Sequence, residues 1–281
     1  MTHRTLARIC DTNHGSVPLN TTDFSEVPPA VVDGARHIAE REYGRDARKV
    51  NSLVGQMIAL YLMADDKDIA IVFNPGGWGW TPISQAPPWL TILKGMEKVL
   101  EEAGHKVITL NYLRTMRSLG GQFGEIGALV KLSRAKGREL AARVNHLTQH
   151  RPRLKVIITG ESNGASMAED TVRFLRDNPR VFSVQTGTPF WARSEPHPRS
   201  LIINHNGVEP DSFSSGSIRR IITANVQALF GRYKGSKGNI LFYIGAPGHV
   251  YNWEYVTIRE KITDFLKQTV ISERSQETVN S

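Results

Sequence analysis

The feature that most constrains this chain is a regular alternation of short apolar segments with longer segments of helical periodicity, which begins near residue 68. Strands are predicted at 69–73, 106–112, 154–159, 180–185, 200–205 and 239–244, and helices at 89–102, 127–149, 165–176, 217–230 and 253–268. Strands that are apolar on both sides need cover on both faces. The pattern therefore predicts an α/β fold with a mostly parallel central sheet flanked by helices. Its ligand site should lie at the carboxyl ends of the strands.

The residues on either side of this pattern differ in character. Residues 1–30 contain scattered Pro, Gly, Asn and Thr and predict an extended arm, whereas helices are predicted at 31–48 and 50–64. The second of these helices should bury one apolar face on the main sheet, formed by Val50, Leu53, Val54, Met57, Ile58 and Tyr61. We therefore divide the chain into a helical N-terminal extension (1–68), a main domain (69–270) and a polar C-terminal tail (271–281).

Composition excludes several classes of protein. The chain has 281 residues, of which 40% are hydrophobic and 22% charged, and this is the balance of a globular domain. Its single cysteine, Cys10, excludes an intramolecular disulfide and a cysteine-based zinc site. The first ten residues lack the apolar core of a secretory signal, and no apolar run approaches the roughly 20 residues of a membrane-spanning helix. We therefore expect a soluble, cytoplasmic protein.

The charge of the chain bears on its partners. A formal net charge of +8 predicts a weak attraction to anionic surfaces. Because Lys and Arg are scattered along the chain, we expect no specific nucleic-acid site. The glycine-rich loop that follows the first strand does not satisfy G-x-G-x-x-G, so we expect no dinucleotide, and we expect no other cofactor and no metal. No feature of the sequence predicts a particular oligomeric state.

A candidate nucleophile lies between the strand at 154–159 and the helix that follows it. The segment Gly160-Glu161-Ser162-Asn163-Gly164 matches G-x-S-x-G, and its position between a strong strand and a strong helix is where a nucleophile elbow must lie. Glycines on either side allow the close approach of strand and helix that such a turn requires. The alternative is a glycine-rich turn in which Ser162 only caps the helix. We favour Ser162 as the nucleophile.

Among nine histidines, His249 is the best candidate for the base that Ser162 requires. It lies in the segment Gly245-Ala-Pro-Gly-His-Val-Tyr251, a loop that follows the last predicted strand, and its small neighbours allow a tight, exposed turn. The order of serine before histidine also suits a catalytic triad. His205, at the end of a predicted strand, is the reserve candidate, and an ordinary surface histidine is the structural alternative.

The carboxylate that would orient the histidine should follow the strand at 200–205. Its loop contains Asp211, whose short side chain beyond the Pro210 turn suits a fixed hydrogen bond to an imidazole. Glu209 lies two residues earlier and remains the alternative acid. Both carboxylates would face solvent if the loop had no catalytic role.

Backbone amides are expected to form an oxyanion hole beside Ser162. One amide is that of Asn163 at the start of the helix, and the other is that of Gly77 or Trp78 in the Asn-Pro-Gly-Gly-Trp-Gly-Trp loop at 74–80. The structural alternative for that loop is a glycine turn with tryptophans that serve only the fold.

The aromatic residues predict an apolar pocket. All five tryptophans (78, 80, 89, 191 and 253) are placed in loops or first helical turns at the predicted active edge, a distribution that the core alone does not readily explain. The proposed lining of an acyl or aromatic pocket is Trp80, Phe190, Trp191 and Tyr251.

With these motifs in view, residues from about 69 to 270 resemble the α/β-hydrolase superfamily. The matching pieces are the Asn-Pro-Gly-Gly loop, Gly-Glu-Ser-Asn-Gly at the elbow, an acid after a later strand, and Pro-Gly-His near the end. The resemblance implies a triad in the order 162, 211, 249. Two features depart from the family. The N-terminal 68 residues have predicted helices where the family commonly has two strands, and the connection between 185 and 200 leaves little room for a cap domain.

The function expected from these residues is that of a serine hydrolase. It would cleave an ester-like acyl bond of a small molecule or lipid through an acyl-enzyme, with esterase, lipase or thioesterase chemistry implied by the resemblance. Two alternatives remain at this point. One is an acyltransferase of the same fold, and the other is a non-catalytic protein that keeps the fold and binds a ligand or an anionic surface.

Overall fold

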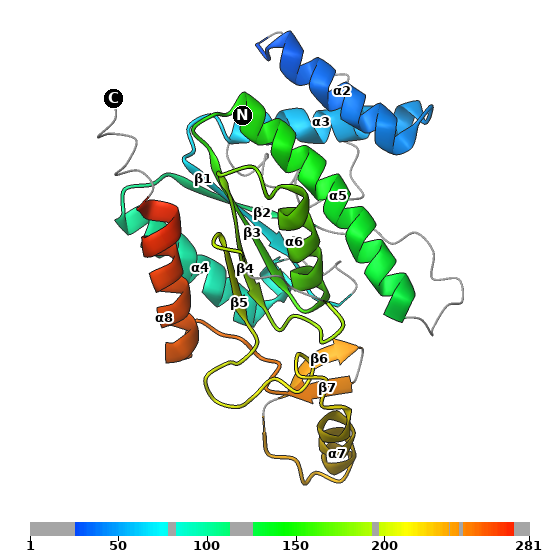
Figure 1. The fold of residues 1–281 in the computed structure, drawn as a ribbon, viewed down its shortest axis with the longest axis vertical. Coiled ribbons are helices and arrows are strands. Elements are labelled where there is room, and N and C mark those ends of the chain that lie inside the picture. Colours follow the sequence, from blue (N-terminus) through cyan, green and yellow to red (C-terminus); the bar gives the residue numbers. More distant parts are fainter. Residues whose placement is uncertain are drawn as a thin grey trace.

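The computed structural model describes residues 26–77, 83–112, 126–192, 197–235, 237–241 and 244–272. Its centre is a five-stranded, wholly parallel sheet of order β2-β1-β3-β4-β5 (Figure 1). The strands are β1 (Ile69–Asn74), β2 (Val107–Asn111), β3 (Lys155–Glu161), β4 (Val181–Thr186) and β5 (Ser200–Ile203). The expected α/β class and its parallel sheet are therefore confirmed.

Helices cover both faces of this sheet, as the apolar character of its strands demands. On one face lie α3 (Ala47–Met63), α5 (Ile126–His150) and α6 (Asn163–Phe174), and α2 (Pro29–Tyr43) packs on α3 and α5. The other carries α4 (Pro87–Glu102), preceded by the 3₁₀ turn Ile83–Gln85, and α8 (Val256–Phe265), continued by the π-helical segment Leu266–Ile271. None of the helices that the structure describes combines the length and apolarity needed to cross a membrane.

The alternation of side chains along β1 separates two hydrophobic cores. Ala70 and Val72 join the core shared with α3, α5 and α6, whereas Ile69, Ile71 and Phe73 join the core shared with α4 and α8. Successive side chains of a strand point to opposite faces, so a strand in this position has to be apolar throughout. All six residues of β1 are buried.

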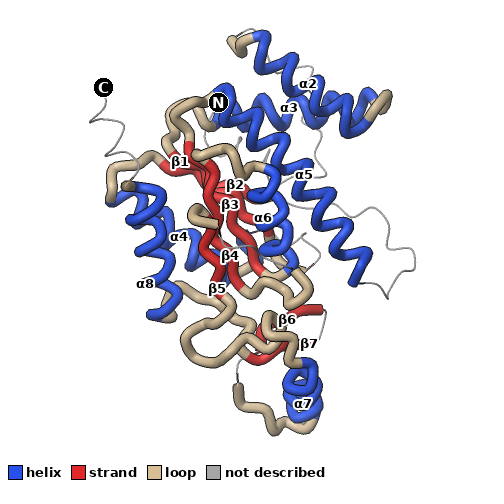
Figure 2. Tube along the Cα trace, in the orientation of Figure 1, coloured by secondary structure: helices blue, strands red, loops and turns tan. Residues whose placement is uncertain are grey.

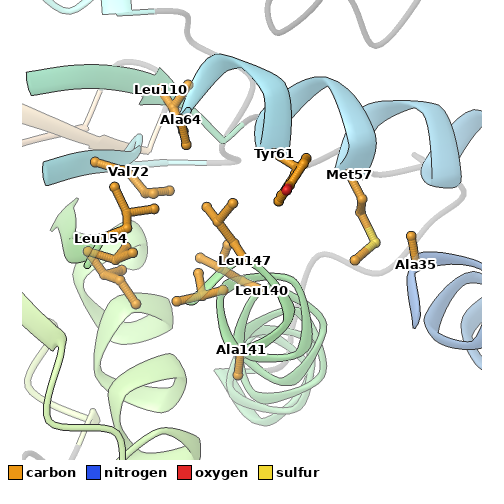
Figure 3. Close-up of a cluster of buried hydrophobic side chains, with 14 of the residues drawn as sticks. Ala35, Met57, Tyr61, Ala64, Val72, Leu110, Leu140, Ala141, Leu147 and Leu154 are labelled. Atoms are coloured by element: carbon orange, nitrogen blue, oxygen red, sulfur yellow. The ribbon is translucent and has the colours of Figure 1, made fainter. Parts of the chain in front are cut away.

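The N-terminal extension packs on the first of these cores through α3. Its buried residues are the six that the helical spacing predicts, namely Val50, Leu53, Val54, Met57, Ile58 and Tyr61. Figure 3 shows Met57 and Tyr61 on the side of α3 that faces α5, in one cluster with Leu140 and Leu147 of that helix. The ion pair between Arg143 and Glu42, at 3.0 Å, links α5 to α2. No strand precedes β1 among the described residues.

One predicted strand is wrong. The segment 239–244 does not add a sixth strand to the main sheet. Instead β6 (Lys237–Leu241) and β7 (Ile244–Pro247) form a separate antiparallel pair, on which α7 (Ile218–Leu229) packs. A short apolar run has the same composition in a buried parallel strand and in a hairpin, so periodicity alone did not distinguish the two. Figure 2 shows this unit of β6, β7 and α7 beyond the main sheet.

The connections between strands change faces at the carboxyl ends of β1 and β3. These strands are neighbours, yet the chain passes from β1 to α4 on one face and from β3 to α6 on the other. In open α/β sheets, ligands bind at the point where successive connections switch faces in this way. The loop at 75–77 and the turn at Ser162 both begin at this point.

Candidate active site

Ser162 forms a strained turn between β3 and α6. Its backbone has φ 54° and ψ −123°, and it is the only residue other than glycine with positive φ in the described part of the chain. A β-carbon on Gly164 would collide with the carbonyl oxygen of Asn74, and one on Gly160 would collide with the backbone of Gly164. The two glycines therefore let α6 approach β1 and β3 closely. Such strain persists where the surrounding structure enforces it, commonly at functional sites.

His249 and Asp211 form a buried pair. The imidazole Nδ1 lies 2.7 Å from Asp211 Oδ2, and the two residues are 2% and 1% exposed. A carboxylate can only accept, so Nδ1 carries the proton and Nε2 is left as the basic nitrogen. This is the tautomer that a general base requires.

Asp211 is held by further donors and stays charged. The Tyr251 hydroxyl donates to Oδ2 at 2.7 Å, as does Ser214 Oγ at 3.0 Å, and the backbone amides of Phe213 and Ser214 donate to Oδ1. Burial opposes the charged form, but the hydrogen bonds from His249, Tyr251 and Ser214 outweigh it and hold the pKa of Asp211 below its ordinary value. Burial and the charge of Asp211 both raise the pKa of Tyr251, which therefore remains a donor.

Polar contacts join the loop of Asp211 to the loop of His249. Asn206 Nδ2 donates to the carbonyls of Gly248 and Val250, both at 3.1 Å. Ser212 binds the Pro247 carbonyl through its amide and its hydroxyl, both at 2.9 Å. Hydrogen bonds thus hold the loops of Asp211 and His249 together as one unit.

The two candidate acids occupy different places. Asp211 contacts the imidazole, whereas Glu209 accepts from the Gly248 amide at 3.1 Å and pairs with Arg220 at 2.7 Å. Glu209 therefore supports the histidine loop from outside. The reserve histidine, His205, is exposed, and its Nδ1 accepts from the amide of Gly207 at 2.8 Å.

Ser162 and His249 both lie near the end of β4. The Ser162 amide donates to the Thr186 carbonyl at 3.0 Å, and the next residue, Gly187, packs against the imidazole. A β-carbon on Gly187 would lie 2.6 Å from His249 Cε1. Ser162 Oγ and His249 Nε2 are both buried and lack a hydrogen-bond partner among the described residues. Buried polar atoms without partners are rare, and each calls for an explanation.

The glycine loop after β1 lies beside Ser162. A β-carbon on Gly76 would lie 3.4 Å from Ser162 Cβ, and the Asn163 side chain donates to the Gly77 carbonyl at 3.2 Å. Asn163 is also the first residue of α6, where the helix dipole favours negative charge. Trp78 and Trp80, predicted for the oxyanion hole and the pocket, lie outside the described residues.

The predicted aromatic pocket needs correction. Phe190 and Trp191 form a chain of ring contacts that continues through Phe213 to His249, with centroids 4.9, 5.1 and 5.1 Å apart. Tyr251, expected in the pocket lining, is instead fully buried and hydrogen-bonded to Asp211.

Two of the tryptophans assigned to the active edge serve the core. Trp89 is fully buried, and its Nε1 donates to Thr186 Oγ1 at 3.2 Å. Trp253 covers Gly95 of α4. A tryptophan in a first helical turn or a loop can still bury its ring in the core, because the ring extends far from the backbone.

Glu161 was not singled out from the sequence, although it adjoins Ser162. Its Oε2 lies 3.5 Å from the position of a β-carbon on Gly76, so the carboxyl points toward the glycine loop. Burial raises the pKa of Glu161, the nearby His249 lowers it, and the charge of Asp211 raises it. The only feature of the sequence that could have identified Glu161 as a site residue is its position as the first variable residue of G-x-S-x-G. Within the described residues, no three His, Cys, Asp or Glu side chains gather to hold a metal ion.

Comparisons with known proteins add two loose structural likenesses. A cutinase from Trichoderma reesei, solved with a phosphonate inhibitor, aligns over 95% of each chain at 12% identity, with a TM-score of 0.38. An extracellular α/β-hydrolase from a Paenibacillus species aligns over 57% of this chain and 52% of its own, at 15% identity and a TM-score of 0.26. These TM-scores are too low to assign an activity. No protein-family model and no curated protein matches the sequence.

Proposed function

From its α/β-hydrolase fold, with the elbow at Ser162, we propose that the chain is a serine hydrolase that cleaves an ester-like acyl bond. Ser162 is the nucleophile, His249 the general base and Asp211 the residue that orients it. The observation that carries this proposal is the pair of buried atoms, Ser162 Oγ and His249 Nε2, each without a hydrogen-bond partner among the described residues. The Nδ1 of that same imidazole is bound to Asp211.

In the first half of the reaction, Ser162 Oγ attacks the carbonyl carbon of the substrate while its proton passes to His249 Nε2. Asp211 stabilises the imidazolium through the Nδ1 hydrogen bond. The carbonyl oxygen becomes an oxyanion, and the amides of Asn163 and of the loop at Gly77 are the donors we assign to it. Collapse of this intermediate breaks the ester bond, and Nε2 returns its proton to the leaving alkoxide.

In the second half, water replaces the alcohol. His249 Nε2 takes a proton from the water as its oxygen attacks the acyl carbon, and a second oxyanion forms at the same amides. Collapse expels Ser162 Oγ, which recovers the proton from Nε2, and the carboxylic acid leaves. The active site is then regenerated without any cofactor in the scheme.

The test is a comparison of the wild-type chain with the Ser162→Ala variant. A fluorophosphonate probe should label the wild type and leave the variant unlabelled, and turnover of a series of p-nitrophenyl esters should be lost with the label. The matched control is Ser52→Ala, which removes an exposed serine of α3 and should change neither result. Retained ester turnover in the Ser162→Ala variant would contradict the assignment, as would an unlabelled, inactive wild type.

A further inference from the structure

The helix α7 carries a stripe of apolar side chains that no other described part of the chain covers. Positions three and four residues apart share one side of a helix, so these residues lie together. The stripe, called here the α7 stripe, consists of Ile218 (57% exposed), Ile222 (58%), Val226 (47%), Leu229 (84%) and, just beyond the helix, Phe230 (72%). Contiguous exposed apolar surface of this kind usually marks an interaction site.

The α7 stripe is not what attaches α7 to the rest of the protein. On its inner side, Ile221 packs against the pair Phe213 and Ala246. Asn225 exchanges two hydrogen bonds with Gly245, at 2.7 and 3.0 Å. These contacts hold the helix on β7, so packing against the described residues does not explain the apolar character of the outer face.

The sequence around the α7 stripe has an unusual charge. Residues 212–253 contain no Asp or Glu, and they contain five basic residues, Arg219, Arg220, Arg232, Lys234 and Lys237. Five of the eight net positive charges of the chain therefore come from this segment. Arg220 is paired with Glu209 at 2.7 Å, whereas Arg219, Arg232 and Lys234 are exposed beside or just beyond the stripe.

We propose that the α7 stripe docks this protein onto the surface of an anionic lipid bilayer. The helix lies in the plane of the interface, with its apolar side chains among the upper acyl chains and its basic side chains at the acidic headgroups. An anionic bilayer offers both apolar surface and negative charge. A second copy of the chain would offer apolar surface but no negative charge, because a symmetric contact would bring two basic segments without Asp or Glu together.

Two successive side-chain contacts connect α7 to the candidate active site. Ile221, on the inner face of α7, packs with Phe213, whose ring stands 5.1 Å from that of His249. Figures 1 and 2 show α7 at the periphery, beyond β6 and β7. Docking on the bilayer does not depend on the proposed function. The further idea that the bilayer supplies the acyl substrate rests on the proposed function.

The experiment measures vesicle binding by the full-length chain. Co-sedimentation is compared between vesicles of phosphatidylcholine and vesicles of phosphatidylcholine with phosphatidylserine, at low and high salt. We expect binding to the anionic vesicles that weakens as salt is added. The Ile222→Ser, Leu229→Ser double variant should bind them roughly tenfold more weakly or worse, because two apolar side chains leave the interface. The control is Leu62→Ser, which changes an exposed leucine of α3 and should bind as the wild type does.

A second pair of variants tests the charge. Arg232→Gln with Lys234→Gln should weaken binding to the anionic vesicles and flatten its dependence on salt. The matched control removes two exposed charges from α4, by Lys94→Gln with Lys98→Gln, and should leave binding unchanged. If both pairs of substitutions weaken vesicle binding equally, the vesicles attract the net charge of the whole protein, and the assignment of docking to α7 is overturned.

Other outcomes also overturn the proposal. The proposal is overturned if the wild-type protein fails to bind anionic vesicles. It is also overturned if the Ile222→Ser, Leu229→Ser variant binds them as well as the wild type does. A wild-type dimer that the stripe variant converts to monomer, without vesicle binding, assigns the stripe to a second copy instead. Two variants distinguish failure of the docking proposal from failure of the proposed function. Ser162→Ala should still bind vesicles, and the stripe variant should still turn over a soluble ester.

Discussion

The two halves of the candidate site are positioned by different physical means. Ser162 stands at the junction of β3 and α6, where its orientation follows from a strained backbone and from glycines that let helix and strand touch. His249 and Asp211 lie in loops beyond the main sheet. Their positions follow from hydrogen bonds, of which the carboxylate of Asp211 alone accepts five.

This difference predicts two kinds of failure. A half that depends on close backbone packing tolerates no added volume, so substitutions there should reduce stability and activity together. A half that depends on polar contacts should lose activity when a single donor or acceptor is removed, with a smaller change in stability.

The largest effect is expected for Asp211→Asn. An amide can donate to Nδ1 and so favour the tautomer with a proton on Nε2, which cannot accept the proton of Ser162. We expect kcat for ester hydrolysis to fall by about 10³ to 10⁴, by analogy with the loss of the orienting acid in other triads. Steady-state kinetics measure it. The control, Glu209→Gln, should change kcat only a few-fold, and the opposite ranking would exchange the roles of the two acids.

In the other half of the site, Gly164→Ala should destabilise the fold. Its β-carbon would collide with the Asn74 carbonyl, so α6 must move away from β1. We expect a loss of about 3 kcal/mol in the free energy of unfolding, measured by urea denaturation, with activity falling in parallel. Gly231→Ala is the comparison, since Gly231 has positive φ but open space around it. If the two variants lose equal stability, close packing at the elbow is not what holds Ser162.

The same contrast explains which parts of the molecule could be predicted from the sequence. Backbone-determined features leave a local signature. The G-x-S-x-G segment lies between a strand and a helix as expected, and the spacing of apolar residues in α3 identifies all six of its buried side chains. Both patterns are local, because each involves residues that are close together in the sequence. Over such short distances the geometry of the backbone alone determines which side chains share a face.

Features that depend on distant partners leave no such signature. The hydroxyl of Tyr251 meets Asp211 across 40 residues of sequence, and nothing near Tyr251 distinguishes that role from a place in a pocket. The segment 239–244 is apolar whether it joins the main sheet or pairs with its own neighbour, as it does in β6 and β7. Trp89 is buried because β4 lies beneath it, which its position in the first turn of α4 does not reveal.

A smaller effect is expected for Tyr251→Phe. Removing the hydroxyl takes one donor from the charged form of Asp211, so the pKa of that carboxyl should rise toward its ordinary value. We expect kcat to fall about tenfold, as for the loss of a hydrogen bond to a charged group, with KM little changed. Tyr61→Phe, in a buried position of α3, is the control, and an unchanged kcat would reduce Tyr251 to a packing residue.

The smallest effect is expected for Glu161→Gln, and it concerns stability. Burial raises the pKa of Glu161, so its contribution to folding is fully present below its ordinary pKa of 4.5 and is lost as pH rises through the higher value of the folded state. At neutral pH the buried charge opposes folding, and an uncharged glutamine removes that opposition. Tm of the variant should therefore exceed that of wild type at neutral pH, and the difference should close on acidification.

Thermal unfolding over a pH series measures this difference. Glu101→Gln, an exposed position of α4, is the matched control and should leave the pH dependence of Tm unchanged. A wild type more stable than the Glu161→Gln variant at neutral pH would mean that the attraction between Glu161 and His249 outweighs the effect of burial. Glu161 would then belong with the hydrogen-bonded half of the site, even though it is adjacent in sequence to Ser162.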